Sequence, residues 1–508
     1  MIIKPDNYLK KDSSYKLNNL RKDILESLEY GLNSVDPFLS VNNLLILDNN
    51  KIKIEDQYFD LSNIKNIYLV AFGKAALKMS IAIINKIRID YGIISSNQAI
   101  NSLLDKLDQT ANEYGNINFD IELIKQNSSK IIYIKAGHPL PDENSILAGS
   151  KIVNIIENVK EDDLVFILIS GGGSALVESS LIPLEKLKNL TEDLLKKGAN
   201  INELNTIRKH LSRIKGGNLL RICKAKVISL ILSDVPGDPF DVIASGPTYF
   251  DSSTFNDAYN IFKRFQLDEK FPDIKRIFQD GINGKISDTL KEENYNKLKS
   301  EGKIFNILVG SNFICCQNII NNLKSKNYNI FYPGSLLEGN AEDAAKIFSG
   351  FLKSAYKGQF QLYFTCSKDS NENLFPLAII WGGETTVIVK GSGKGGRNQH
   401  FVLSFLDNLE KFSEIERLKE NFLFSICSFG TDGIDGVSPA AGAIADNWTL
   451  DYIEKNKIDL NYFISNSDSY SFFDKVKDAI ITGSTGTNVT DIGILLIDLN
   501  KDQKFNKK

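Results

Sequence analysis

The chain has 508 residues, of which 42% are hydrophobic and 24% are charged, and its formal net charge at pH 7 is -3. A chain of this length exceeds what one hydrophobic core usually holds, so we expect two α/β domains. The 60 lysine and arginine residues nearly balance the 63 aspartate and glutamate residues, which argues against a nucleic-acid surface or a polybasic membrane anchor.

The N-terminal segment, residues 1–17, has no apolar core of the kind found in signal peptides, and the longest apolar runs are too short to span a bilayer. The five cysteines show no CxxC spacing, which favours free thiols over disulfides or a zinc site; they are Cys223, Cys315, Cys316, Cys366 and Cys427. We therefore expect a cytoplasmic protein.

Short β-rich apolar runs alternate with helical patterns in the first half of the chain. The runs IYLVAF (67–72), LVFILIS (164–170) and VISLIL (227–232) are each followed by a polar turn or a helical pattern. This alternation is typical of parallel sheets built from βαβ units. The polar stretches 92–130 and 355–375 lack sustained apolar periodicity, so we interpret them as surface insertions.

A composition change after Pro247 marks the expected domain boundary. The chain becomes polar and helical before strands resume at IFNILVG (304–310). We expect a Rossmann-like N-terminal domain over residues 1–265, a helical polar linker over 266–305, and a second, smaller α/β domain over 306–508. The second domain should contain strands at LAIIWGG (377–383), TTVIVKG (385–391), FLFSICSFG (422–430) and IGILLIDL (492–499).

Polar and glycine-rich groups follow the first two of these strands, where open α/β sheets bind ligands. Lys74 lies after IYLVAF at the start of an expected helix and could hold an anion. Taken alone, it is better explained as an ordinary surface lysine. After LVFILI, the segment SGGGSA contains Gly172, Gly173 and Ser174 before an expected helix. Three glycines allow close backbone approach to a phosphate or carboxylate, so we predict an anion site.

A pair of carboxylates follows the third strand. Asp234 and Asp238 flank the turn at Pro236-Gly237, so they cannot share one helix face and could face a common cavity. Such a pair suits magnesium coordination or acceptance of a substrate proton. A loop capped by aspartate side chains explains the pattern equally well.

The glycines at 391, 393 and 396 form a GxGxxG pattern before an expected helix. A dinucleotide site would also need an acidic residue at the end of the next strand, about 20 positions on. Here that place falls in the helical stretch EIERLKENF. Arg397 directly after the last glycine favours phosphate over ribose recognition.

The segment GTDGIDG (430–436) resembles part of a calcium loop, but the EF-hand spacing does not continue. We therefore expect Asp432 and Asp435 to shape a turn. The three histidines, His138, His210 and His400, show no metal-ligand spacing, so we expect each to be packed or hydrogen-bonded rather than catalytic.

Taken together and in order, these motifs resemble the glycerate 2-kinase family, whose second half is often called the MOFRL domain. The resemblance runs through GKAALKM (73–79), AGHPLPDENS (136–145), DDLVFILISGGGSAL (162–176), NTIRKHLSRIKGGNL (205–219), LSDVPGDPFDVIASGPT (232–248), GGETTVIVKGSGKGGRNQ (382–399), GTDGIDG (430–436) and TGSTGTNVTDIG (482–493). The sequence departs from the family pattern at His400, at Ser484 and in the segment 339–342.

The resemblance implies transfer of the γ-phosphoryl group of ATP to the 2-hydroxyl of D-glycerate, with Mg²⁺, in a cleft between the two domains. Carried over by motif, Lys74 and Arg397 would be catalytic cations and Asp234 a catalytic or metal-linked carboxylate. We assign substrate or nucleotide binding to Gly172, Gly173, Ser174, Ser311, Asn312, Gly395 and Gly396, and metal binding to Asp234 and Asp238.

Two other functions remain open from the sequence. A hydroxypyruvate reductase that uses NAD(P)H would explain the GxGxxG pattern, but the missing acidic residue counts against it. A non-catalytic sensor of sugar acids or nucleotides could also use glycine loops. The sequence leaves both a monomer and a homodimer possible.

Overall fold

The computed structural model describes residues 3–115, 117–360 and 374–500, and it divides the chain into two compact units. The first unit is Pro37–Val309, and the second combines Met1–Asp36 with Gly310–Lys508. The N-terminal 36 residues therefore belong with the second half of the chain, and the expected linker 266–305 lies inside the first unit. The α/β class and the two-unit organisation are as expected.

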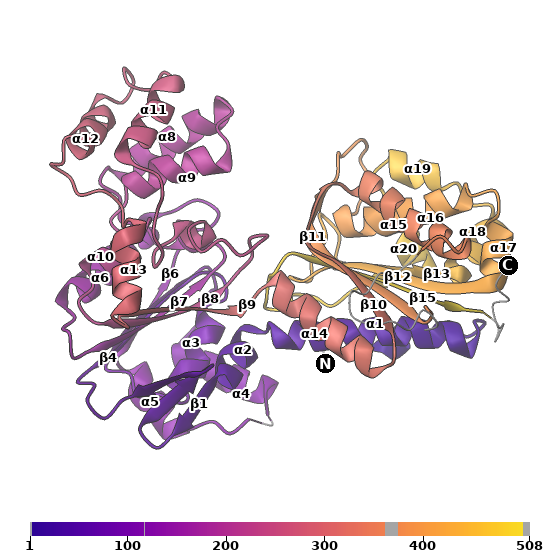
Figure 1. Cartoon of the computed structure of the whole chain (residues 1–508), viewed down its shortest axis with the longest axis horizontal. Coiled ribbons are helices and arrows are strands. Elements are labelled where there is room, and N and C mark those ends of the chain that lie inside the picture. The colour runs from indigo at the N-terminus through magenta and orange to yellow at the C-terminus, as the bar shows by residue number, and fades with distance from the viewer. Residues whose placement is uncertain (1–2, 116, 361–373, 501–508) are drawn as a thin grey trace. The chain divides into compact units, whose positions relative to one another are not determined.

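A six-stranded sheet forms the centre of the first unit (Figure 1), in the order β6-β5-β4-β7-β8-β9. The pairs β4–β5, β5–β6, β4–β7 and β7–β8 are parallel. Counted from β4 as strand 1, this is the 3-2-1-4-5-6 order of a Rossmann fold. The strands are β4 Ile67–Phe72, β5 Tyr91–Ser96, β6 Ile131–Lys135, β7 Leu164–Ser170, β8 Lys226–Leu232 and β9 Ile304–Gly310.

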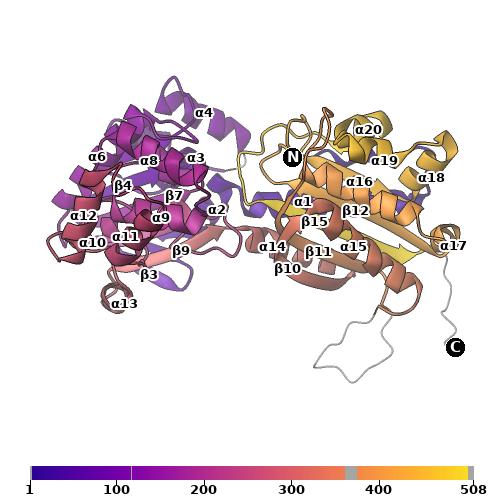
Figure 2. The ribbon, with the colours of Figure 1, turned by 90° about the horizontal axis from the view of Figure 1, so that it is seen from above.

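Helices and a small antiparallel sheet, β1-β2-β3, surround this centre. The remaining elements of the unit are α2 Pro37–Leu44, β1 Leu45–Asp48, β2 Lys51–Ile54, β3 Gln57–Asp60, α3 Ala76–Ile84, α4 Leu103–Glu113, α5 Ile121–Ser128, α6 Glu143–Asn158, α7 Gly173–Leu176, α8 Leu184–Lys196, α9 Ile201–His210, α10 Asn218–Ile222, η2 Ile243–Ser245, α11 Phe255–Arg264, α12 Pro272–Ile282 and α13 Glu292–Ser300. Figures 1 and 2 show α8, α9, α11 and α12 gathered in one group, which has its own buried core.

Two expectations for the first unit differ from the structure. The stretch 92–130 is not only a surface insertion, because β5 within it pairs with β4 and β6 inside the main sheet. The stretch 266–305 contains the helices α12 and α13 but does not link the two units, because it lies inside the first unit and Ile274 and Phe278 of α12 are fully buried. The expected insertion at 355–375 lies largely outside the described residues.

The second unit contains a mixed six-stranded sheet in the order β10-β11-β15-β12-β13-β14. Only β10 and β11 are parallel among its pairs, and the other four pairs are antiparallel. The strands are β10 Asn329–Asn340, β11 Leu377–Thr386, β12 Phe422–Gly430, β13 Gly442–Asp446, β14 Ala479–Ile480 and β15 Asp491–Leu499.

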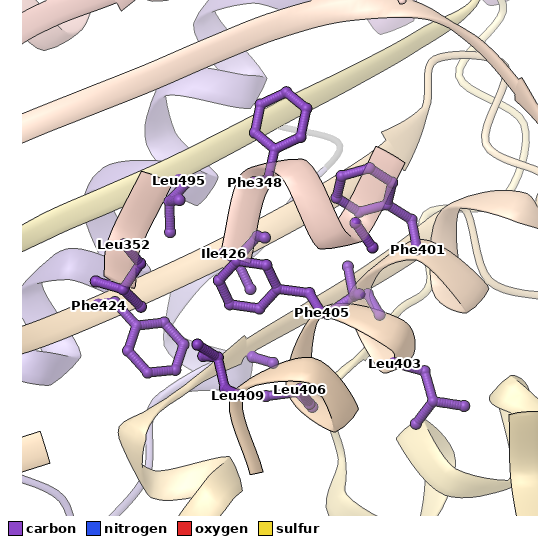
Figure 3. Packing of buried hydrophobic residues seen from close by; sticks show 14 of the residues in the cluster. Phe348, Leu352, Phe401, Leu403, Phe405, Leu406, Leu409, Phe424, Ile426 and Leu495 are labelled. Atoms are coloured by element: carbon purple, nitrogen blue, oxygen red, sulfur yellow. The ribbon is translucent and has the colours of Figure 1, made fainter. Parts of the chain in front are cut away.

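Helices cover both faces of this sheet, with α1 and α14 on one face and α15 and α16 on the other (Figure 1). Figure 3 shows Phe348 and Leu352 of α15, Phe405 and Leu409 of α16, and Phe424 of β12 meeting in one core. The other elements of the unit are η1 Pro5–Tyr8, α1 Tyr15–Ser34, α14 Asn312–Ser325, α15 Ala341–Tyr356, α16 Arg397–Glu410, α17 Ile415–Asn421, α18 Asn447–Asn456, α19 Leu460–Ser465 and α20 Ser469–Val476.

None of the helices in the described residues is long and apolar enough to cross a membrane. Four of the cysteines are free, and Cys315, Cys316 and Cys427 among them are buried. This agrees with the expected free thiols, while Cys366 lies outside the described residues.

A buried ion cluster fixes α1 within the second unit. The guanidinium of Arg21, which is 0% exposed, donates from Nε to Asp446 Oδ2 at 2.5 Å and from Nη1 to Asp478 Oδ1 at 2.7 Å. The Lys10 ammonium lies 2.7 Å from the same Asp478 oxygen. Burial alone would lower the pKa of Arg21, but the two carboxylates raise it above its ordinary value. The N-terminal segment is therefore joined to residues more than 400 positions away.

Arg21→Ala should lower the free energy of unfolding by about 3–5 kcal/mol, because it leaves two carboxylates buried without their main cation. Urea unfolding measures this loss. Lys22→Ala is a matched control on the same helix, since Lys22 forms an exposed pair with Glu26, and its cost should stay below about 1 kcal/mol. Equal stabilities of the two variants would contradict a structural role for the cluster.

Candidate active site

Two loops of the first unit meet where β4 and β7 end. These strands are neighbours at the point where the strand order reverses, which is the position where doubly wound sheets bind ligands. The amide of Lys74 donates to the carbonyl of Gly171 at 2.9 Å, and the amide of Ala75 donates to Ser170 Oγ at 3.0 Å. The lysine motif and the triple-glycine segment therefore lie side by side at the carboxyl edge of the sheet.

Gly172 has a left-handed backbone, with φ of 80°, and two side chains border it. A Cβ atom at this position would lie 3.0 Å from His138 Nε2 and 3.4 Å from Lys74 Cε. The imidazole and the lysine stem thus approach the same point above the glycine. A side chain at position 172 would displace both.

Asp234 follows β8 and packs against the same loop. A Cβ atom on Gly171 would lie only 1.9 Å from Asp234 Oδ2, so the glycine makes room for the carboxylate. Asp238 lies further along the turn, where its amide donates to the carbonyl of Val235 at 3.1 Å. Lys74, Gly172 and Asp234 therefore surround one small region at the carboxyl edge of the sheet.

The helix expected after the triple glycine is only the four-residue α7, Gly173–Leu176. A helix this short carries little of the macrodipole that can attract an anion to a helix N-terminus. Positive charge comes instead from Arg208 of α9, whose Nη2 donates to the carbonyl of Ser174 at 3.0 Å. Ser174 Oγ lies 2.7 Å from Ser245 Oγ.

Arg208 belongs to a buried ion network that the sequence analysis missed. Glu178, 1% exposed, lies 2.5 Å from the Lys215 ammonium and 3.6 Å from Arg208 Nη2. Burial lowers the pKa of Lys215 to about 8, although Glu178 acts in the opposite direction. Arg208 and Lys215 both lie in the motif NTIRKHLSRIKGGNL. The sequence signal that could have indicated this network is a pair of basic residues seven positions apart, next to two glycines.

Arg397 lies in the second unit, where two carboxylates hold it. Its Nε donates to Asp491 Oδ2 at 2.6 Å, its Nη2 donates to Asp491 Oδ1 at 3.1 Å, and its Nη1 donates to Glu384 Oε1 at 2.7 Å. Burial acts to lower the pKa of Arg397, but Asp491 and Glu384 raise it above its ordinary value. The guanidinium is therefore charged and fixed in orientation.

The N-terminus of α16, after the GxGxxG pattern, is capped by the protein itself. The amides of Asn398 and Gln399 donate to the two carboxylate oxygens of Asp435 at 3.0 and 2.8 Å. Gly396 permits this approach, because a Cβ atom there would lie 2.2 Å from Asp435 Oδ1. Gly395 packs in the same way against Ser469. These bonds give both glycines a packing role, and they make Asp435 a cap of α16, a contact that the turn expected at Asp435 does not include.

Ser311 and Asn312 support the neighbouring loop. Ser311 caps α14 by accepting a hydrogen bond from the Ile314 amide at 3.3 Å. Asn312 Nδ2 donates to the carbonyls of Val489 and Asp491, both at 2.8 Å. Both side chains are buried, so they position the segment that carries Asp491. A direct ligand contact by either residue stays a prediction.

A cavity of about 610 Å³ opens beside Arg397 within the second unit. Its wall includes Thr385, Gly395, Arg397, Ile434, Val437 and Ser469. Ile434 and Val437 are exposed at 55% and 78%, so apolar side chains border the charged group. This size is in the range of small-molecule sites.

Few side chains in the described residues are grouped so that they could bind a metal ion. No group of three or more His, Cys, Asp or Glu side chains within them could hold a metal ion. Mg²⁺ commonly uses one or two carboxylates together with waters and substrate phosphates. Asp234 and Asp238, on one turn beside the glycine segment, fit that requirement. The role stays a prediction for both.

The pairing of Asp491 with Arg397 generates a prediction about pH. Burial raises the pKa of Asp491 from 3.8 to about 6, although Arg397 acts in the opposite direction. Because the folded state then holds this proton more tightly than the unfolded state, stability should fall as pH rises from about 4 to 6, by at most about 3 kcal/mol from this group.

Asp491→Asn should remove this contribution, so the difference in unfolding free energy between wild type and variant should change across that pH window. Urea unfolding at a series of pH values measures it, with Asp451→Asn, which alters an exposed carboxylate, as the control. A difference that stays constant from pH 4 to 7 would contradict the assignment.

Comparisons with known proteins agree with these motifs. The model described as "Domain of unknown function (DUF4147)" matches residues 23–279, and that of the MOFRL family matches residues 377–491. The glycerate 2-kinase of Pyrococcus horikoshii is 36% identical over 94% of this chain and 98% of its own length. The D-glycerate 2-kinase of Thermotoga maritima is 35% identical over 86% of this chain and 91% of its own.

The fold is similar as well. The crystal structure of a glycerate kinase from Thermotoga maritima matches with a TM-score of 0.72 and 32% identity, covering 94% of this chain and 99% of that one. The family models, relatives and structure match both units of the chain, and the chain belongs to the glycerate 2-kinase family.

Proposed function

We propose that the protein transfers the γ-phosphoryl group of ATP to the 2-hydroxyl of D-glycerate and releases 2-phosphoglycerate and ADP. Membership of the glycerate 2-kinase family supports this activity. The observation that carries it is the meeting of Lys74, Asp234 and the Gly171–Gly173 backbone at the switch point of the sheet. Phosphoryl transfer needs these elements, since it depends on positioning and on neutralisation of charge.

In this proposal Lys74 neutralises charge on the transferring phosphoryl group. Its main chain is bonded to Gly171 at 2.9 Å, and its Cε lies 3.4 Å from the point where a Cβ of Gly172 would be, so the side chain runs along the glycine segment. Asp234 either accepts the proton of the attacking hydroxyl or holds Mg²⁺. The proton leaves late in a loose transition state, so a carboxylate of ordinary basicity is sufficient.

Arg397 supplies a second cation. An arginine side chain has five N–H donors, and its bonds to Asp491 and Glu384 use three of them. The other two can bind oxygen atoms of a phosphate, while the two carboxylates keep the guanidinium plane fixed. The cleft expected between the two domains stays a prediction.

If Asp234 takes the metal role, Mg²⁺ would be held by Asp234 and Asp238 and would offset the charge of the triphosphate. The small number of carboxylates supports a metal that arrives with the nucleotide, because most of its ligands would then be phosphate and water oxygens. The chain's own part is to orient these two carboxylates on the 233–238 turn.

We also propose the cytoplasm as the compartment of this enzyme. The free thiols of Cys223, Cys315, Cys316 and Cys427 support it, because disulfides are rare in a reducing compartment.

The reductase alternative is less well supported. A dinucleotide site places the pyrophosphate on the N-terminal amides of a helix that follows a strand and its glycine loop. The strand expected over 385–391 is not formed, because β11 ends at Thr386 and ten residues separate it from the helix that begins at Arg397. Asp435 accepts hydrogen bonds from the helix amides.

A coupled assay tests the proposed function. We expect ADP release that requires D-glycerate and stops when EDTA removes Mg²⁺, together with formation of 2-phosphoglycerate. A parallel reaction with hydroxypyruvate should not oxidise NADH or NADPH. Oxidation of either cofactor without ADP release would favour the reductase and reject the kinase.

Lys74→Ala should lower turnover about a hundredfold while the protein remains folded, because one charge contact to the transition state is worth about 3 kcal/mol. Lys51→Ala, at an exposed position of β2, should leave turnover unchanged. Arg397→Ala should show a similar loss of turnover together with lower stability, since Asp491 then stays buried without its main partner. Turnover of Lys74→Ala close to that of wild type would remove this lysine from the mechanism.

A further inference from the structure

His138 is an exposed side chain that nevertheless reaches the centre of the candidate active site. It follows β6, the edge strand of the sheet, in the segment before α6. Its Nε2 and Cδ2 atoms lie 3.0 and 2.9 Å from the point where a Cβ of Gly172 would be, and Lys74 Cε lies 3.4 Å from that point. The sequence predicts a packed or hydrogen-bonded histidine, so its exposure is unexpected.

The segment that carries His138 is anchored next to it. Asp142 caps α6 by accepting from the Ser145 amide at 2.9 Å, and the Asp142 amide donates to Ser145 Oγ at 3.0 Å. The backbone of Gly137 also donates to the Asp142 carboxylate. These bonds hold both sides of the histidine, so the ring has a defined position relative to Gly172 and does not sit on a loose loop.

The ring is uncharged at neutral pH in this surrounding. Partial burial, followed by the neighbouring charge of Lys74, lowers the pKa of His138 below its ordinary value of 6.5. A neutral imidazole beside an ammonium group can donate a hydrogen bond to an anion without repelling the lysine. This pair therefore suits a ligand that carries an anionic group.

We propose that His138 is a substrate-contact residue, whose Nε2 donates a hydrogen bond to an oxygen of D-glycerate held above Gly172 beside Lys74. The inference rests on the proposed function and names the acceptor-binding part of the same site. Two observations carry it: the common approach of His138 and Lys74 to one point, and the anchoring of the histidine segment by Asp142. The nucleotide is not contacted by this residue.

His138→Leu and His138→Gln test the proposal together. His138→Leu should raise the KM for D-glycerate about tenfold or more, because a hydrogen bond to a charged ligand is lost. The KM for ATP and the thermal unfolding midpoint should stay near the wild-type values. The Gln side chain places an amide donor near the position of Nε2, so His138→Gln should retain part of the affinity. Leu140→Ala, at a residue of the same segment that is 60% exposed, is the matched control.

An unchanged KM for D-glycerate in His138→Leu would overturn the proposal, as would an equal rise in both KM values with a lower unfolding midpoint. Calorimetric titration with D-glycerate alone separates this inference from the kinase activity. Binding to wild type but not to His138→Leu supports the contact even if no ADP is released, whereas equal binding rejects it.

Discussion

The candidate active site depends on the close approach of the loops after β4 and β7. The hydrogen bond from the Lys74 amide to the Gly171 carbonyl joins these loops, and it is possible because the two strands are parallel neighbours where the strand order reverses. Glycines at 171 and 172 let Asp234 and His138 approach from other loops. The arrangement of the candidate site in the first unit therefore follows from the strand order and from glycines that leave room for neighbouring side chains.

In the second unit, carboxylates rather than glycine loops fix the position of the cationic side chain. Arg397 is fixed by Asp491 and Glu384, and Asn312 holds the backbone at Asp491. The helix end beside Arg397 is capped by Asp435, so a phosphate at this position would meet the guanidinium and not the helix amides. In both units, the positive charge offered to a ligand thus comes from lysine or arginine side chains rather than from helix N-terminal amides.

Local patterns predicted the strands and the groups that follow them. Lys74, the triple glycine and Asp234 each come directly after an apolar run, and parallel strands bring such positions to one edge. Contacts between distant residues could not be predicted in this way. Arg21 binds Asp446 and Asp478, and Asp435 caps a helix that begins 38 positions earlier. The shortness of α7 was also not predicted, because the glycine segment indicates where a helix can begin but not where it ends.

Protection of Lys74 from chemical modification tests the central claim most directly. The rate at which an amine-reagent acylates each lysine can be followed by mass spectrometry, with and without D-glycerate, Mg²⁺ and a non-hydrolysable ATP analogue. We predict that the ligands slow the modification of Lys74 strongly and leave the exposed Lys51 unaffected. Equal rates of Lys74 modification under saturating ligands would contradict a binding site at the switch point of the first unit.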